Sequence, residues 1–219
     1  MAWIFSFNFT DIMRKTVFIF AMLMATLTIK AQYEEGDILI QPRVGVTISN
    51  VTDGDKSKLN VTYGVDFERF FTDQLSFTAG VLFTDQGCKH EIYYDTDGSQ
   101  YDDTVMNLYY GAIPITANYY ILPGLALKAG IQPAFRVKAN IQHGNEKLDF
   151  DKMLSMLFPG EDVKMNTFDL SFPVGLSFEY NRVTIDARYN IGVTKLLSGS
   201  TDAVHNKVFA ITLGYKFGR

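Results

Sequence analysis

The last segment of the chain alternates strictly between large apolar residues and small or polar ones. Its apolar positions are Phe209, Ile211, Leu213, Tyr215 and Phe217, and the residues between them are Ala210, Thr212, Gly214 and Lys216. Because side chains along a β-strand point to opposite faces in turn, this segment predicts a strand with one apolar and one polar face. That pattern, continued to the C-terminus, is typical of a strand that faces lipid on one side.

Seven earlier segments carry a similar alternation. They lie near Gly36–Ser49, Lys58–Arg69, Gln74–Thr84, Thr104–Ile121, Leu125–Ile141, Thr167–Tyr180 and Val183–Thr194. We therefore expect an all-β fold, an eight-stranded antiparallel transmembrane β-barrel. The fourth strand is the least regular, and Pro114 predicts a bulge in it.

The connections between these segments alternate in length. Phe71–Asp73, Leu122–Gly124 and Asn181–Arg182 are tight turns, whereas 51–57, 85–103, 142–166 and 195–205 are longer and polar. Outer-membrane barrels have short periplasmic turns and long extracellular loops, which orients the predicted barrel. Within the third long loop, Asp149–Phe158 predicts a short amphipathic helix.

Residues 1–31 have the features of a secretory signal peptide. Arg14 and Lys15 form a basic start, Thr16–Leu27 form an apolar core, and Ala31 offers a small residue at the cleavage site. We interpret Met13 as the true start and 32–219 as the outer-membrane barrel domain. The alternative is an anchor that stays attached. No other segment has enough consecutive apolar residues for a spanning helix.

Aromatic residues gather where the even-numbered predicted strands end, on the side of the tight turns. Aromatic rings are enriched at membrane interfaces. The sequence therefore predicts a periplasmic aromatic girdle formed by Phe67, Phe70, Phe71, Tyr119, Tyr120, Phe178, Tyr180, Tyr215 and Phe217.

Charged residues recur on the polar faces of the predicted strands, and the two signs nearly balance. Unpaired charges away from water are costly, so in a narrow barrel they must pair. The predicted interior charge network comprises Arg43, Asp66, Glu68, Lys128, Arg136, Lys138, Asp169, Glu179, Asp186, Arg188 and Lys216. We expect it to form a salt-bridged plug. A conducting pore and an acid/base pair of carboxylates are the alternatives.

Composition narrows the classes of partner and cofactor. The net charge is −4 and the pI is near 5.4, so there is no basic surplus for nucleic acid. The single cysteine, Cys88, excludes an intramolecular disulfide and a zinc site built on several thiolates. All three histidines fall in predicted loops, and converging loops could join His90, His143 and His205 to Cys88 as a metal site.

Metal binding is nevertheless not what these patterns favour. The histidines and Cys88 have no strict ligand spacing. The acidic run of Asp95, Asp97, Asp102 and Asp103 lacks the full EF-hand spacing and is interpreted as solvated. There is also no phosphate-binding glycine loop, nucleophile elbow or triad spacing. We expect no metal, no cofactor and no catalytic residues.

Three segments resemble a known family. Tyr110–Tyr120, Leu125–Phe135 and Ile185–Thr194 are similar to the outer-membrane β-barrel family of Bacteroidota that includes PorT-like proteins, and the last segment is the most specific. The chain departs from the family pattern at Ala112 and Asn118, where a carboxylate and a lysine are frequent. The resemblance implies an outer-membrane location and an eight-stranded barrel, and it implies little about activity.

These patterns together predict a small, non-enzymatic outer-membrane barrel that acts through its extracellular loops in binding, adhesion or envelope integrity. Its expected partners are outer-membrane lipid and lipopolysaccharide, together with an extracellular or envelope protein. The alternatives are a narrow porin-like channel for small solutes, an outer-membrane enzyme that modifies lipid, and a soluble lipocalin-like binding protein.

Overall fold

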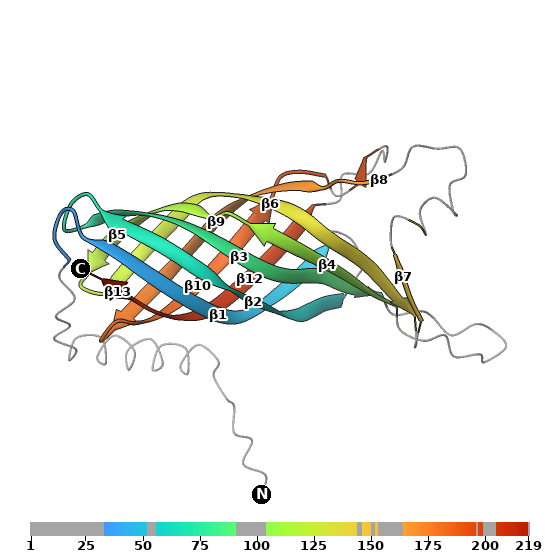
Figure 1. The fold of residues 1–219 in the computed structure, drawn as a ribbon, viewed down its shortest axis with the longest axis horizontal. Helices are drawn as coiled ribbons and strands as arrows, with labels where there is room; N and C mark the ends of the chain where they lie inside the picture. Colours follow the sequence, from blue (N-terminus) through green and yellow to red (C-terminus); the bar gives the residue numbers. More distant parts are fainter. Residues whose placement is uncertain are drawn as a thin grey trace, which may run out of the picture. The chain divides into compact units, whose positions relative to one another are not determined.

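The computed structural model describes residues 33–51, 56–90, 104–143, 146–149, 152, 164–195, 197–198 and 205–218. The predicted signal peptide, acidic run and most of the predicted helix lie outside these residues. The described wall is an antiparallel sheet of tilted strands (Figure 1). Its strands are β1 (Ile38–Val51), β2 (Lys56–Phe70), β3 (Leu75–His90), β4 (Thr104–Ala112), β5 (Ile115–Leu122), β6 (Leu125–His143), β9 (Phe168–Tyr180), β10 (Val183–Gly192), β12 (Asn206–Tyr215) and β13 (Phe217–Gly218).

The sheet closes on itself because its first and last long strands pair. β1 pairs with β12 from Arg43 opposite Gly214 to Val51 opposite Asn206. β5 continues β4, and β13 continues β12 along β1. The wall therefore has eight strand positions, and the predicted eight-stranded antiparallel barrel is confirmed. Beyond the wall, β7 (Glu146–Asp149) pairs with β6, and β8 (Lys164–Met165) pairs with β11 (Leu197–Ser198).

The irregularity predicted at Pro114 is a short break between β4 and β5. Proline has no backbone N–H and cannot donate to a neighbouring strand. The wall stays hydrogen-bonded through the break, because the Pro114 carbonyl accepts from Gly80 N at 3.0 Å and Ile113 N donates to Pro133 O at 2.8 Å. Ile113 and Ile115 both point outward and are exposed.

The tight turns lie where the sequence places them, at the end of the barrel that holds the C-terminus in Figure 1. Asn181 and Arg182 join β9 to β10 with φ of 48° and 70°, so both central residues have positive φ. This is the backbone of a type I′ hairpin turn, whose twist matches that of the flanking strands. Gly124, with φ of 81°, supplies positive φ between β5 and β6.

The two faces of the wall differ sharply in polarity. Large apolar side chains are exposed on the outside of every wall position, as shown by Val44 at 55%, Phe77 at 45% and Ile211 at 44%. Most of the buried residues inside are polar or charged, including Asp66 at 0% and Asp186 at 1% exposure. A soluble barrel buries its apolar residues, so this arrangement contradicts the lipocalin-like alternative and is that of a lipid-facing wall. No helix within the described residues is long and apolar enough to cross a bilayer.

The alternation of β6 changes at a β-bulge that the sequence did not predict. Tyr109 of β4 pairs with Lys138, whereas the next residue, Tyr110, pairs with Arg136, so Val137 is an extra residue. After the bulge the two faces exchange. Lys138 therefore lies exposed on the outside, Ala139 is buried inside, and the prediction that Lys138 belongs to the interior is wrong.

Several strands also extend farther from the tight turns than predicted. β3 runs to His90 and β6 to His143, so these two histidines end strands and do not lie in loops. At 16 and 19 residues, β3 and β6 exceed the length of about 9–11 residues that a tilted strand needs to cross a bilayer. Their ends therefore continue beyond the hydrocarbon layer on the side of the long loops.

Candidate functional site

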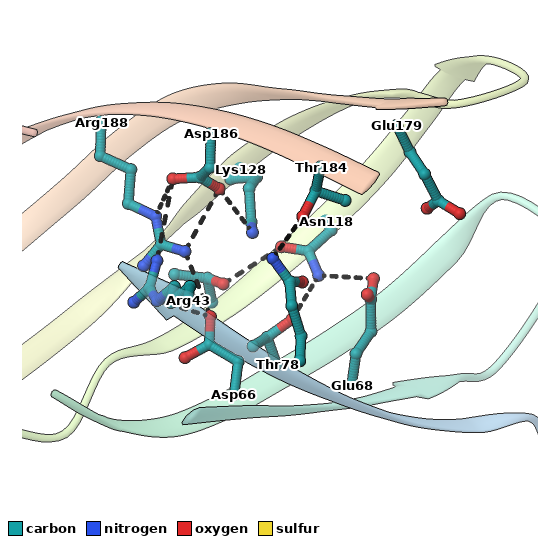
Figure 2. Close-up of polar contacts among 12 residues, drawn as sticks. Arg43, Asp66, Glu68, Thr78, Asn118, Lys128, Glu179, Thr184, Asp186 and Arg188 are labelled. Atoms are coloured by element: carbon teal, nitrogen blue, oxygen red, sulfur yellow. Dashed lines mark hydrogen bonds and ion pairs between the residues drawn. The ribbon is translucent and has the colours of Figure 1, made fainter. Parts of the chain in front are cut away.

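The middle of the barrel interior holds a cluster of five charged side chains from four strands. Arg43 comes from β1, Asp66 from β2, Lys128 from β6, and Asp186 and Arg188 from β10. Each strand directs every second residue inward, so the 2-residue spacing of Asp186 and Arg188 puts both on the same face. All five side chains are at most 7% exposed, and Figure 2 shows them converging across the lumen.

Asp186 is the most heavily contacted member of this middle cluster. Its Oδ1 lies 2.5 Å from Arg188 Nε, and its Oδ2 lies 2.8 Å from Lys128 Nζ. Asp66 Oδ2 lies 3.2 Å from Arg43 Nε and 3.4 Å from Arg188 Nη2. Arg43 Nη1 is a more distant neighbour of Asp186, at 3.9 Å. The two carboxylates thus tie strands from different sides of the barrel together.

A second charged group, centred on Lys216, lies nearer the tight turns. Lys216 Nζ is 2.7 Å from Glu68 Oε2 and 2.9 Å from Glu179 Oε2. It also donates to the Tyr120 hydroxyl at 2.9 Å, and that hydroxyl donates to Glu68 Oε1 at 2.7 Å. Ser76 and Asn118 donate to the same Glu68 oxygen, at 2.5 and 3.1 Å.

Three aromatic rings surround the Lys216 ammonium on the side of the turns. The ring centroids of Tyr33, Tyr120 and Phe70 lie 5.2, 5.4 and 6.0 Å from Nζ, within the range of a cation–π interaction. Tyr33 precedes β1, and its hydroxyl donates to Glu179 Oε1. Burial and this hydrogen bond raise the pKa of the Tyr33 phenol, so it stays a neutral donor.

The aromatic residues predicted as a girdle divide between the two faces. Phe67, Phe71, Tyr119, Tyr180, Tyr215 and Phe217 are exposed on the outside, and Phe178 is half-buried. Phe70 and Tyr120 are buried inside, at 1% and 8% exposure, so placing them in the girdle was wrong. The period of two explains this, because Phe70 shares a face with Glu68, and Tyr120 with Asn118.

The end of the interior toward the long loops carries an ion-paired group and a hydrogen-bonded group. Lys58 Nζ lies 3.3 Å from Asp85 Oδ2 and donates to Asn107 Oδ1 at 2.5 Å. Asp169 is buried and accepts from the Thr194 hydroxyl, and His205 Nδ1 lies 3.1 Å from the Thr194 carbonyl. These contacts fix the strand ends from which the long loops leave.

An apolar cluster also lies on the inner wall toward the long loops. It consists of Leu82, Leu108, Tyr110, Ala112, Ala134 and Ala139, with Met106 and Ile141 packed against it. The bulge at Val137 turns Ile141 inward, toward this cluster. Arg136 is half-buried beside this cluster, paired with Tyr110 across β4 and β6, and is not part of the middle cluster.

The interior charges balance within the described residues. The interior contains six cationic side chains and six carboxylates. The cations are Arg43, Lys58, Lys128, Arg136, Arg188 and Lys216, and the carboxylates are Asp66, Glu68, Asp85, Asp169, Glu179 and Asp186. Among the cavities that these side chains line, one of about 20 Å³ lies between the middle cluster and the long-loop end. A space of that size accommodates about one water molecule.

Several members of these networks were not identified from the sequence as site residues. Three of them, Lys58, Asp85 and Asn107, lie near the ends of β2, β3 and β4 that lead to the long loops. From the sequence, these positions were placed at the boundaries between strands and loops. Tyr33 precedes the first strand and carries no periodic signal. Asn118 and Ser76 are buried on the inner face and alternate with residues that point outward, so strand parity could have found them.

No metal-binding group of three or more histidine, cysteine or acidic residues occurs in the described part of the chain. His205 lies at the base of the last strand against Thr194. For His90, His143 and Cys88 the structure describes only the backbone, in β3 and β6. The acidic run lies outside the described residues.

Comparison with known proteins identifies the family. The model of the outer membrane protein beta-barrel domain matches residues 30–198. The chain belongs to this family. No curated protein matches the chain. As a member of the family with a lipid-facing wall, the protein is located in the outer membrane.

Two solved outer-membrane proteins have a similar fold. Ail, the attachment invasion locus protein of Yersinia pestis, in complex with the heparin analogue sucrose octasulfate, has a TM-score of 0.50 at 16% identity, covering 84% of this chain and 99% of Ail. Neisserial surface protein A has a TM-score of 0.50 at 14% identity, covering 84% of this chain and 100% of that protein. At these identities the likeness shows the fold alone.

Proposed function

We propose that this outer-membrane barrel is non-conducting and non-enzymatic, and that it acts through its long-loop end in binding, adhesion or envelope integrity. The observation that carries the proposal is the cross-lumen middle cluster, in which Asp66 and Asp186 bind cations from β1, β6 and β10. Opening a path through it would separate buried ion pairs, which costs several kcal/mol for each charge left unpaired.

The two ends of the interior support the same proposal. Lys216 and its three rings lie together inside the barrel near the tight turns, next to a cavity of about 420 Å³ that Tyr33, Phe70 and Tyr120 line. Toward the loops, the apolar cluster around Leu108 narrows the lumen further. A barrel of eight strands has an interior just wide enough for its own side chains or one small ligand. A narrow porin-like channel would need these layers to move apart together.

The charge of the long connections indicates what kind of partner the loop end would bind. The connections beyond the wall strands, residues 52–55, 91–103, 144–167 and 193–205, contain 13 Asp and Glu against 4 Lys and Arg. Ail was solved with a heparin analogue, a polyanion. Loops with this excess of carboxylates repel polyanions, so the proposed partner is a basic protein surface or a lipopolysaccharide layer bridged by divalent cations.

Planar-bilayer conductance tests the non-conducting interior. The full chain, refolded in detergent and inserted into the bilayer, should give no steady unitary current at neutral pH. As a positive control, Asp66→Ala combined with Asp186→Ala should allow measurable current if the folded barrel survives, which heat-dependent migration in gels reports. Steady currents from the unaltered protein would favour the channel.

Loop replacement tests the action of the loop end. A variant with residues 91–103 replaced by a short Gly-Ser turn should keep the folded barrel and lose its effect on surface binding or on envelope resistance to detergent. A matched insertion of Gly-Ser residues at Asp73, in a tight turn, should leave both unchanged. An outer-membrane enzyme acting on lipid would be revealed by altered lipid A in cells that express the protein, which we expect to be absent.

The family subgroup and the route of export belong to the same proposal. The segments Tyr110–Tyr120, Leu125–Phe135 and Ile185–Thr194 support a Bacteroidota, PorT-like origin. Residues 1–31, with Met13 as the start, support export by a cleaved signal peptide. N-terminal sequencing of the protein from outer membranes should begin at Gln32. A start upstream of Ala31 would instead indicate an anchor that stays attached.

A further inference from the structure

The cavity of about 420 Å³ lies at the end of the barrel that carries the tight turns and, in Figure 1, the C-terminus. Its walls come from Tyr33 before β1, from residues 72–74 in the turn between β2 and β3, and from residues 121–123 at the end of β5, with Phe70 and Tyr120 beside them. Its volume is within the range of small-molecule binding sites, about 300–1,000 Å³. In an outer-membrane barrel this end faces the periplasm, so the cavity is separate from the long-loop end.

Contacts within the chain hold the walls of this cavity in place. The Tyr33 ring packs on Phe70 with 4.8 Å between centroids, and Phe70 packs on Tyr120 at 5.3 Å. In the turn, Thr72 Oγ1 accepts a hydrogen bond from Gln74 N at 3.2 Å, and Gln74 O accepts one from Tyr120 N at 2.8 Å. The aromatic wall and the polar turn are therefore joined, as in the preformed pockets that bind small molecules.

The charge at the cavity is negative. Among the described residues that line it, Asp73 is the charged one, and its carboxylate is in no ion pair with another described residue. Glu34 and Glu35 lie exposed in the segment before β1. Arg69, at the end of β2, lies over the Phe71 ring, which is exposed on the outside of the barrel. A cavity with this surrounding charge attracts cations and repels anions.

The walls of the cavity favour an organic cation. Ile121 and Leu122 are 44% and 55% exposed and form an apolar side, and Asp73 and Gln74 form a polar one. The half-buried Tyr33 ring adds an aromatic surface. A carboxylate, an amide oxygen and an aromatic ring are groups that bind an ammonium, and an apolar wall suits an aliphatic stem.

The barrel already binds one ammonium in this way, next to the cavity. The Lys216 ammonium lies 5.2–6.0 Å from the centroids of the same three rings, and two glutamates pair with it. Lys216 itself does not line the cavity. The cavity repeats the combination of aromatic rings and carboxylate with Asp73, and no cation stands among the described residues of its lining.

We propose that this cavity binds a primary ammonium group carried on a short aliphatic stem. The ammonium would donate to the Asp73 carboxylate and the Gln74 amide oxygen beside the Tyr33 ring, and the stem would pack on Ile121 and Leu122. Two sources carry this chemistry at the periplasmic end: the ethanolamine headgroup of a phospholipid and a soluble aliphatic amine. The site is separate from the proposed action of the long loops.

Titration of the full barrel in a maltoside detergent, which carries no amine, tests the proposal. Cadaverine, an aliphatic diamine, should bind saturably and shift the NMR signals of Asp73, Gln74 and Leu122. The uncharged diol of the same length and the neutral sugar N-acetylglucosamine should not. Binding of the diol or of the sugar as tight as that of the diamine would overturn the proposal, as would the absence of saturable cadaverine binding.

A pair of charge variants assigns the binding to this cavity. Asp73→Asn should weaken cadaverine binding about tenfold, because it removes a charged hydrogen-bond partner. Glu35→Gln removes a charge at the same end of the barrel but outside the cavity lining, so its dissociation constant should stay within about twofold of the unaltered protein. Equal losses in the two variants would mean that the general field of the surface binds the diamine, and would contradict the site.

A pair of substitutions at Tyr33 separates its ring from its hydroxyl. Tyr33→Phe loses the hydrogen bond to Glu179 and keeps the ring, so it should bind cadaverine as the unaltered protein does. Tyr33→Leu removes the ring and should weaken binding about threefold or more. Equal dissociation constants for the two variants would contradict the aromatic part of the site.

Added lipid distinguishes the two sources of the ammonium. If the ligand is a lipid headgroup, phosphatidylethanolamine added to the micelles should weaken cadaverine binding, and phosphatidylglycerol should not. If the ligand is a soluble amine, both lipids should leave the dissociation constant unchanged. Either result supports the ammonium site. Equal weakening by both lipids would overturn it, because the lipid that competes would then need no ammonium.

Discussion

Arg188 of β10 and Asp66 of β2 form an ion pair across the barrel, with Nη2 and Oδ2 3.4 Å apart. In the sheet, β1 and β12 lie between their strands. The pair therefore joins parts of the wall that share no backbone hydrogen bonds. Asp186 contacts Lys128 of β6. This contact and the Arg188–Asp66 pair together span the lumen, so a few side chains hold the opposite walls of the barrel in place.

Removing the charge of Asp186 should destabilise the barrel strongly. Asp186→Asn leaves Lys128 and Arg188 without their nearest carboxylate, and breaking a buried pair from one side costs about 3–5 kcal/mol. Urea unfolding in lipid vesicles measures the loss. Asp73→Asn, the same change at an exposed turn, should stay within about 0.5 kcal/mol of the unaltered protein. Similar midpoints for both variants would contradict the importance of the cluster.

Lys128 and Lys138 lie on opposite faces of the same strand, so the same substitution should have different effects. Lys128→Met removes a partner of buried Asp186 and should lower the free energy of unfolding by about 3 kcal/mol or more. Lys138→Met changes an exposed side chain after the bulge and should stay within about 0.5 kcal/mol. Chemical denaturation of the two variants side by side checks this. Equal losses would mean that the bulge at Val137 does not turn Lys138 outward.

Phe70 and Phe71 are neighbours in sequence and differ in environment. Phe70→Ala should cost about 3–5 kcal/mol, because it opens a cavity beside Lys216 and removes one of the rings around its ammonium. Phe71 is 46% exposed on the outside, so Phe71→Ala should cost clearly less. Thermal unfolding in the same detergent measures both. A larger loss of stability in Phe71→Ala than in Phe70→Ala would indicate that Phe70 belongs to the lipid-facing girdle.

Gly80 provides the space that Asp66 occupies. A Cβ at this position would lie 2.0 Å from Asp66 Oδ1 and 2.9 Å from Val65 O, so Gly80→Ala should displace the carboxylate and cost about 1–3 kcal/mol. Gly111 has no heavy atom within 4 Å of the corresponding Cβ, and Gly111→Ala should be neutral or slightly stabilising. Denaturant midpoints of the two variants measure this difference.

The alternation of apolar and polar residues was sufficient to predict the barrel, because the side chains that face lipid must be apolar and the ones that face the lumen can be polar. β1, β2, β10 and β12 show strict exposure patterns, and their inward residues Arg43, Asp66, Asp186 and Arg188 form the middle cluster. What periodicity could not give was the bulge at Val137. One extra residue there reverses the faces of everything that follows, and nothing in the local residue types marks it.

The misplaced aromatic residues have a different cause. Phe70 and Tyr120 were grouped by their position at strand ends and not by parity, although parity assigns both to the interior. Tyr33 could not be placed at all, because its role depends on a contact with Glu179, 146 residues away. Contacts across the lumen of this kind depend on strand tilt and register, which the sequence does not state.

The pairing of β1 with β12 has a consequence for assembly of the protein. The first strand to emerge during export meets its second neighbour only when the last strand has been delivered. Until then β1 presents an open edge. Contacts between distant parts of a chain form slowly, and an unpaired strand edge is prone to aggregation. The machinery that inserts the barrel into the membrane must therefore shield this edge until the barrel closes. A chain without its final strand would therefore not form a smaller closed barrel, because β1 and β10 would both be left as unpaired edges.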